Sequence, residues 1–136
     1  MSFSATTINK QIDHSNIRTI FVVVESFNLK DAAPLDNDAE NVKFWQEMYE
    51  SALLKAGFNV ITRSKINTLM EEQAFIISGA VTQEQALKIG KIAAADAVLF
   101  VNIHLSSDDE VWENVKLIKI ATGEIVGMFT LIYYRI

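Results

Sequence analysis

The sequence predicts an α/β domain of three layers, α/β/α, in which one mixed sheet of about five strands lies between helices. Three observations lead to this fold class. The segment Ile17 to Glu25 is a nearly continuous apolar run rich in β-branched residues, which is typical of a strand that is covered on both faces. Helical segments separate the first three expected strands, and short turns join the last three. We therefore expect the spatial order 2-1-3-4-5, counted along the chain, with the fourth strand antiparallel to the rest.

The N-terminal segment differs in composition from the rest of the chain. Residues 1–16 are polar and rich in Ser, Thr and Asn, so we interpret them as an N-terminal arm. Residues 17–136 are long enough to bury a core, and we expect them to form a single α/β domain. The first strand, IRTIFVVVE, opens this domain.

A long helix is expected to follow a loop over residues 28–40. Its apolar residues recur at helical spacing and form one continuous stripe: Trp45, Met48, Tyr49, Ala52, Leu53 and Ala56. Lys43, Glu47 and Glu50 lie mostly off that stripe. Gly57 follows the last periodic residue, where a left-handed C-cap belongs.

Two shorter helices are expected between the second and third strands. Phe58 to Thr62 is the second strand, and Ser64 is the predicted N-cap of the helix after it. Thr82 and Gln85 form a capping-box pair that opens the next helix. The inner face of that helix is narrow and built of small residues, which lets backbones approach closely: Ala86, Ile89, Gly90 and Ala93.

The C-terminal part reads as three consecutive strands. They are expected over Ala97 to Leu105, Trp112 to Ile120 and Glu124 to Tyr134, with a polar turn at Ser106 to Glu110 and a tight turn at Ala121 to Gly123. Such short connections predict an antiparallel meander.

Composition excludes several classes of function. The 136 residues carry a net charge of −5 and no cysteine. A phosphate backbone requires a basic face, so nucleic acid is not expected as a partner. Without cysteine there is no disulfide and no thiolate metal site. The longest apolar run, Ala93 to Leu105, is too short and too polar for a membrane span.

No catalytic, cofactor-binding or metal-binding set of residues is expected. The carboxylates at Asp108 to Glu110 lack the spacing of a calcium loop, and the two histidines, His14 and His104, have no obvious co-ligands. No serine lies in a nucleophile elbow. The loop over residues 28–40 contains no glycine, which argues against a phosphate cradle at the place where α/β sheets usually bind ligands.

Partly exposed aromatic residues are the candidate interface. Phe44 is adjacent to Trp45, Trp112 opens the fourth strand, and Tyr133 and Tyr134 end the fifth. Large aromatic side chains at a surface are common anchors of protein interfaces, although they could equally cover the sheet within one subunit. Arg63 is a further candidate for contact with a partner, and the alternative for it is an ion pair or cap within the chain.

Taken together and in order, five segments of the chain resemble the family of curli-secretion (CsgG-like) lipoprotein domains. The same fold occurs in the outer-membrane (LpoB-like) activator of penicillin-binding proteins and in the N-terminal domain of the Tol-system propeller protein. The matching segments are VVVESFN from Val22, FNVITRS from Phe58 with a following EEQ, the Ser78-Gly79 pair, KIGKIAAADAVLFVNI from Lys88, and ATGEIV from Ala121. Ala94-Ala95-Asp96 departs from the family's usual Gly-Ala-Asp. Only a short turn stands where the channel-forming members carry long insertions, so a pore is not expected.

The resemblance implies a non-enzymatic, lipoprotein-like interaction domain of the bacterial cell envelope, periplasmic and associated with the outer membrane. It would act by protein–protein docking in secretion or envelope assembly, or by self-association into an oligomer. Contact with the membrane would come only from a lipid anchor upstream of this sequence, and no cofactor is implied. If Met1 is the native start, the alternative is a small cytoplasmic ligand-binding or enzymatic domain, with its pocket at the loop over residues 28–40.

Overall fold

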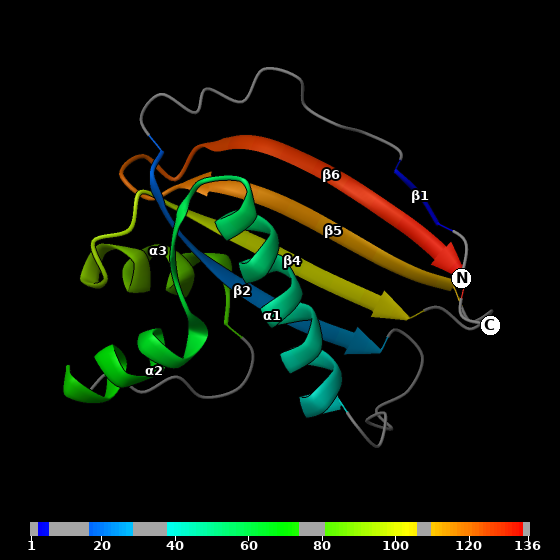
Figure 1. Cartoon of the computed structure of the whole chain (residues 1–136), viewed down its shortest axis with the longest axis horizontal. Helices are drawn as coiled ribbons and strands as arrows, with labels where there is room; N and C mark the ends of the chain where they lie inside the picture. Colours follow the sequence, from blue (N-terminus) through cyan, green and yellow to red (C-terminus); the bar gives the residue numbers. More distant parts are fainter. Residues whose placement is uncertain (1–2, 6–16, 29–37, 74–80, 106–109, 135–136) are drawn as a thin grey trace.

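The computed structural model describes residues 3–5, 17–28, 38–73, 81–105 and 110–134. A three-residue strand precedes the domain, and helices and strands then follow in the expected succession (Figure 1). The elements are β1 (Phe3–Ala5), β2 (Thr19–Asn28), α1 (Asp38–Lys55), β3 (Asn59–Ile61), α2 (Arg63–Glu72), α3 (Gln83–Ile92), β4 (Ala97–Leu105), β5 (Glu110–Lys119) and β6 (Ile125–Tyr134).

The strands form one mixed sheet in the order β1-β6-β5-β4-β2-β3. Strand β2 is parallel to β3 and β4, whereas β5 is antiparallel to β4 and β6. Without β1, this is the predicted order 2-1-3-4-5 with an antiparallel fourth strand, and the prediction is confirmed. The short β1 was not predicted. It pairs with β6 at Leu131 to Tyr133, so β6 is not the outermost strand along its whole length.

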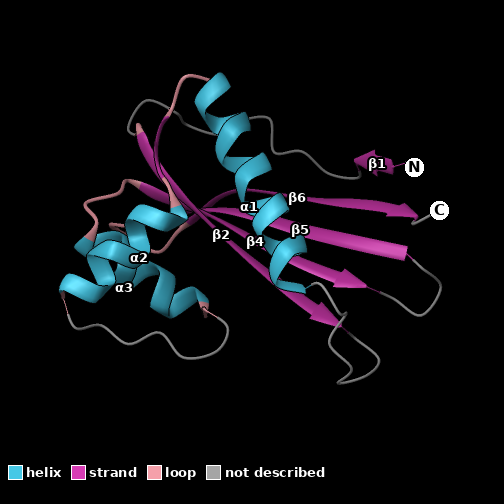
Figure 2. Ribbon diagram, turned by 60° about the horizontal axis from the view of Figure 1, so that its bottom comes forward, coloured by secondary structure: helices cyan, strands magenta, loops and turns pink. Residues whose placement is uncertain are grey.

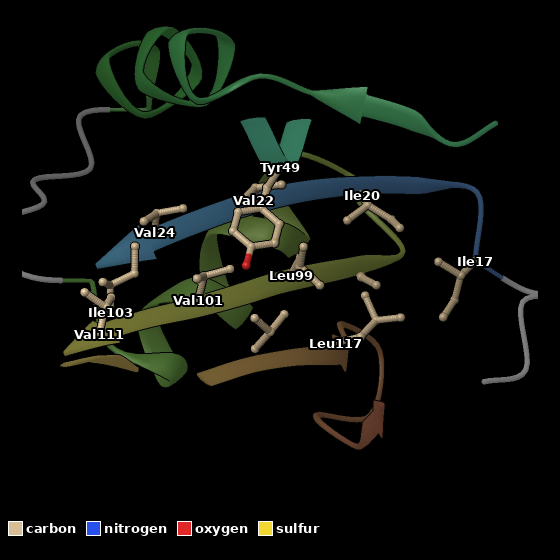
Figure 3. Packing of buried hydrophobic residues seen from close by; sticks show 12 residues of the cluster. Ile17, Ile20, Val22, Val24, Tyr49, Leu99, Val101, Ile103, Val111 and Leu117 are labelled. Atoms are coloured by element: carbon tan, nitrogen blue, oxygen red, sulfur yellow. The ribbon is translucent and has the colours of Figure 1, made fainter. Parts of the chain in front are cut away.

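Each face of the sheet buries its own apolar cluster under helices. Side chains alternate across a strand, so Ile20, Val22 and Val24 lie on the α1 face, where Tyr49 packs on them (Figure 3). Residues of the opposite parity, including Phe21 and Val23, pack against α2 and α3 on the other face. The predicted three-layer α/β/α arrangement follows from this alternation.

The caps and the tight contacts of the helices agree with the sequence in most places. Thr82 and Gln85 form the predicted capping box, and Gly57 takes the left-handed conformation at a φ of +97°. The predicted N-cap of α2 was wrong: Thr62, not Ser64, is the N-cap, and its hydroxyl accepts a hydrogen bond from the Lys65 N–H. The hydroxyls of this segment, at Thr62 and Ser64, are close enough in sequence that propensity alone does not choose between them.

The predicted inner stripe of α1 was right only in part. Trp45, Tyr49 and Leu53 face the core, but three other members of the stripe are exposed: Met48, Ala52 and Ala56. The buried places next to the stripe belong instead to Gln46, which is 5% exposed, and Glu50, which is 8% exposed. Both side chains form hydrogen bonds inside the structure, and such partners allow polar groups to be buried.

Candidate functional site

One part of the sheet carries exposed apolar side chains that no described helix covers. Helices α2 and α3 lie over one end of their face, and β4, β5 and β6 extend well beyond them (Figure 2). The register places the residues of one parity on this face, because His104 pairs with Trp112 and Trp112 pairs with Ile132. We call the uncovered area the open sheet face. It consists of His104, Trp112, Asn114, Lys116, Met128, Thr130, Ile132 and Tyr134.

Three large apolar side chains of the open sheet face are solvent-accessible. Trp112 is 38% exposed, Met128 is 49% exposed and Tyr134 is 52% exposed. Tyr134 stands opposite Glu110, one step diagonally from Trp112, which is within reach for aromatic side chains on neighbouring strands. The Trp112 indole N–H donates to the Glu110 carboxylate, which holds the ring in place.

Polar groups lie between and beside these apolar side chains, because the Asn114–Thr130 pair separates the Trp112–Ile132 pair from the Lys116–Met128 pair. The Thr130 hydroxyl donates to the Asn114 side-chain oxygen at 3.0 Å across the β5–β6 pair. Lys116 stands opposite Met128. Exposed aromatic residues and Met, together with polar groups that can form hydrogen bonds, are common on surfaces that bind another protein.

The structure brings together only part of the predicted interface. Trp112 and Tyr134 both lie on the open sheet face. Tyr133 pairs through its backbone with Val111 and with Phe3, and its side chain lies outside the described ones. Sequence reasoning missed Met128 and Ile132, although a strict two-residue alternation along β6 places both on the same face as Tyr134.

The other two predicted residues lie elsewhere. Phe44 is 60% exposed on α1, in the helical layer on the opposite side of the sheet, and its ring meets Trp45 edge-on at 5.6 Å between centroids. Arg63 opens α2. Its backbone N–H donates to Glu50 at 2.7 Å, and its Nε donates to Asn67 at 3.4 Å.

A polar cleft of about 620 Å³ lies next to Arg63, between α1 and α2. Val24 and Glu25 of β2 line it together with polar residues of both helices. Burial raises the pKa of the Glu25 carboxyl, while a hydrogen bond from the Val81 N–H and the nearby Arg63 charge act in the opposite direction. Two cations, Lys43 and Arg63, and three carboxylates, Glu25, Glu47 and Glu50, line the cleft together with neutral side chains.

Two further findings concern metals and membranes. Within the described ranges, no group of three or more His, Cys, Asp or Glu residues could hold a metal ion. No helix in the described part of the chain is both long and apolar enough to cross a membrane. The alternative pocket at the loop over residues 28–40 falls mainly on residues 29–37, which lie outside the described residues.

Comparison with solved structures identifies the fold. The C-terminal domain of LpoB from Salmonella enterica superposes with a TM-score of 0.67 at 16% identity, over 87% of this chain and 83% of that one. The chain has the LpoB fold. The lipoprotein GNA1162 from Neisseria meningitidis gives a TM-score of 0.66 at 16% identity, over 86% of this chain and 80% of that one. PelC from Paraburkholderia phytofirmans, solved as a dodecamer, gives 0.53 at 12% identity, over 97% and 79%.

The resemblance predicted from the sequence is thus confirmed for the fold. The superpositions establish a shared backbone architecture. At identities this low, a shared fold does not transfer a function. No protein-family model and no curated protein matches the sequence.

Proposed function

We propose that this protein is a non-enzymatic docking module of the bacterial cell envelope, and that the open sheet face contacts its protein partner. The observation that carries the proposal is the exposure of Trp112, Met128 and Tyr134 on one uncovered part of the sheet. Tryptophan and tyrosine supply a large contact area with few rotatable bonds, and they dominate the energetics of many interfaces.

The placement of the side chains supports docking over catalysis. The sheet is a rigid platform, so the exposed aromatic residues lose little conformational freedom when a partner covers them. The polar side chains on the same face, such as Asn114 and Lys116, offer hydrogen-bonding groups to a partner. Docking of this kind needs shape and surface, and it requires no reactive group.

The proposed location rests on the fold. One protein of the same fold is described as a lipoprotein, and the sequence segments quoted above resemble envelope lipoproteins. We therefore place the full-length protein in the periplasm, attached to the outer membrane by a lipid. Fractionation of the native host with an antibody against this domain tests this placement, and recovery in the cytoplasmic fraction would contradict it.

Site-specific photo-crosslinking in the native host tests the docking face. A photoreactive amino acid at Met128 should yield a covalent adduct with another envelope protein. The same amino acid at Leu54, which is exposed on α1, is the matched control and should yield none. Replacing Trp112 with Ala should reduce the adduct at position 128 strongly, since a central aromatic side chain commonly contributes about 2 kcal/mol or more to binding.

The crosslinks also separate docking from self-association. PelC, which shares the fold, was solved as a dodecamer, so the chain itself is the second candidate partner. An adduct at Met128 with the mass of two copies would show that the open sheet face binds a second copy of this chain and not another envelope protein. Adducts from Leu54 alone would show that the open sheet face is not the docking surface.

A further inference from the structure

Strand β2 continues far beyond the strand that pairs with its outer side. Strand β3 pairs with β2 only from Thr19 to Phe21, whereas β2 runs on to Asn28 next to β4. From Val22 onward, no strand of the described part lies on the β3 side. Figure 2 shows the carboxyl end of β2 as the outer margin of the sheet.

The Gln46 side chain occupies the first position after β3 ends. Its amide donates to the Val22 carbonyl at 2.7 Å and accepts from the Val24 N–H at 3.2 Å. These are the two hydrogen bonds that one residue of a paired strand would make. Gln46 therefore takes the place of a missing strand residue, and this explains why a polar side chain is buried on α1.

Beyond Gln46 the same edge continues without a described strand beside it. Alternate residues of a strand direct their backbone groups to the same side. The backbone N–H and C=O groups of Val22 and Val24 are directed away from β4. The backbone groups of Ser26 and Asn28 are therefore directed away from β4 as well. The edge therefore presents the Val24 carbonyl, both backbone groups of Ser26 and the Asn28 N–H.

The polar cleft reaches this edge at Val24 and Glu25, with α1 on one side and the start of α2 on the other. Val24 and Glu25 line it from the sheet, Gln46 and Glu47 line it from α1, and Arg63 and Asn67 line it from α2. Within the described residues, Arg63 forms no ion pair within 4.0 Å, and its side-chain hydrogen bond goes to a neutral amide. Its charge acts on the nearby Glu25 carboxyl, and Glu47 and Glu50 also line the cleft. An acidic group on an entering segment would therefore contact the two cations of the lining, Arg63 and Lys43.

We propose that this cleft binds an extended segment of another polypeptide. The segment pairs as a short strand with β2 from Val24 to Asn28 and places an acidic side chain against Arg63. Backbone hydrogen bonds supply affinity in this mode of recognition, and the flanking side chains supply selectivity. The cleft is separate from the open sheet face, so this binding does not depend on the docking function proposed above.

Hydrogen exchange of the free protein tests the first requirement. The amides of Glu25 and Phe27 point toward β4, so they should exchange slowly. The amides of Ser26 and Asn28 should exchange much faster, by about tenfold or more, because no strand protects them. Equal protection of all four amides would show that the edge is already paired within the chain, and the proposal would be abandoned.

A random nonapeptide library displayed on phage then supplies the ligand. Peptides selected on the intact protein should carry Asp or Glu, and their binding should slow the exchange of the Ser26 and Asn28 amides. Methylation of the peptide nitrogens one at a time should weaken binding at alternate positions only, since a paired strand directs every second N–H at its neighbour. Uniform effects along the peptide, or no selected peptide at all, would count against strand pairing.

Variants of the protein complete the test. Ser26→Pro removes an edge N–H that points away from β4, a place where sheets tolerate proline. It should weaken binding of a selected peptide about tenfold, and Arg63→Gln should weaken it by about the same factor. Leu54→Ala, on the exposed side of α1 and outside the cleft, is the matched control and should leave binding unchanged. If Ser26→Pro does not fold, the methylated peptides still decide the outcome.

Discussion

At the scale of single residues, Asp96 joins three strands of the sheet. One oxygen of its carboxylate accepts hydrogen bonds from the Arg18 and Thr19 N–H groups, both at 2.9 Å. Its backbone bonds to the Thr19 carbonyl and to the Ile120 N–H. The side chain thus ties the start of β2 to the start of β4, and the Asp96 carbonyl adds a bond to the residue after β5.

Replacing Asp96 with Ala should destabilise the protein by about 1–2 kcal/mol. Hydrogen bonds to a charged group contribute more than neutral ones, and partial solvent exposure reduces their value. Urea unfolding measures the change. Asp96→Asn, which keeps an acceptor but loses the charge, should fall between the wild type and Asp96→Ala. An Asn variant as unstable as the Ala variant would assign the whole effect to the charge.

The same residue predicts how stability depends on pH. The backbone hydrogen bonds from Thr19 and Arg18 lower the pKa of Asp96 in the folded protein. The unfolded chain therefore binds the proton more readily than the folded protein does. The stabilisation that ionised Asp96 gives to the folded protein is fully present above the ordinary Asp pKa of about 3.9, and it is lost as the pH falls through the lower pKa of the folded protein. The stability difference between wild type and Asp96→Asn should therefore be constant near pH 6 and shrink below about pH 4. A difference that persists unchanged down to pH 2 would contradict the assignment.

Gln46 gives a third prediction at this scale. In Gln46→Leu, the Val22 carbonyl and the Val24 N–H lose their partner while the new side chain excludes water. An unsatisfied buried polar group costs about 1–3 kcal/mol, so the free energy of unfolding should fall by about 2–4 kcal/mol. Glu47→Leu, one position along on the exposed side of α1, is the control and should change stability by less than about 0.5 kcal/mol. Equal effects of the two substitutions would argue against the role assigned to the Gln46 amide.

At the scale of elements, α3 packs closely on the sheet through Gly90. A Cβ at this position would overlap the Ile120 side chain and lie 3.1 Å from Phe21 Cε1. Gly90→Ala should therefore destabilise the protein by about 1–2 kcal/mol, although alanine favours a helix by about 1 kcal/mol over glycine. Ile120→Val removes the nearest methyl group, so the double variant should recover part of the loss. A double-mutant cycle measures this coupling, and strictly additive effects would contradict the steric explanation.

The elements also show what sequence patterns predict well. Capping signals placed the start of α3, and the small residues of its inner face indicated the close approach at Gly90. Apolar periodicity placed α1 but assigned Met48 to the core and Glu50 to the surface. The pattern failed there because β3 ends early and Gln46 bonds to the free edge of β2. Glu50 is buried with it and accepts hydrogen bonds from Gln46 and from the Arg63 N–H. The free edge of β2 is distant from α1 in sequence, so local spacing does not reveal its bonds to Gln46.

At the scale of the whole molecule, the rules for connections between strands predicted the sheet order. Helical crossovers gave the parallel strands and short turns gave the antiparallel ones. The sequence carried less information about the surface. The residue types of Trp112 and Tyr134 indicated that they were candidates for an interface. That they share one face with Met128 depends on the register of β5 and β6, which residue type does not reveal. Strand β1 has only three residues, too few for a periodic signal.

The last prediction concerns cooperativity between the two helical layers. Strand β2 alternates between the clusters, with Val22 facing α1 and Phe21 facing α2 and α3. Loss of either layer thus removes partners from the same backbone, so both layers should unfold in one transition. Ile89→Ala on α3 should cost about 2–5 kcal/mol. The Trp112→Phe background leaves Trp45, on the opposite face, as the only tryptophan of the chain. In this background, Ile89→Ala should shift the unfolding midpoints measured by Trp45 fluorescence and by far-UV circular dichroism by the same amount. A fluorescence midpoint that does not move when the circular dichroism midpoint does would show that the layers unfold separately, and residues 17–136 would then not be a single cooperative domain.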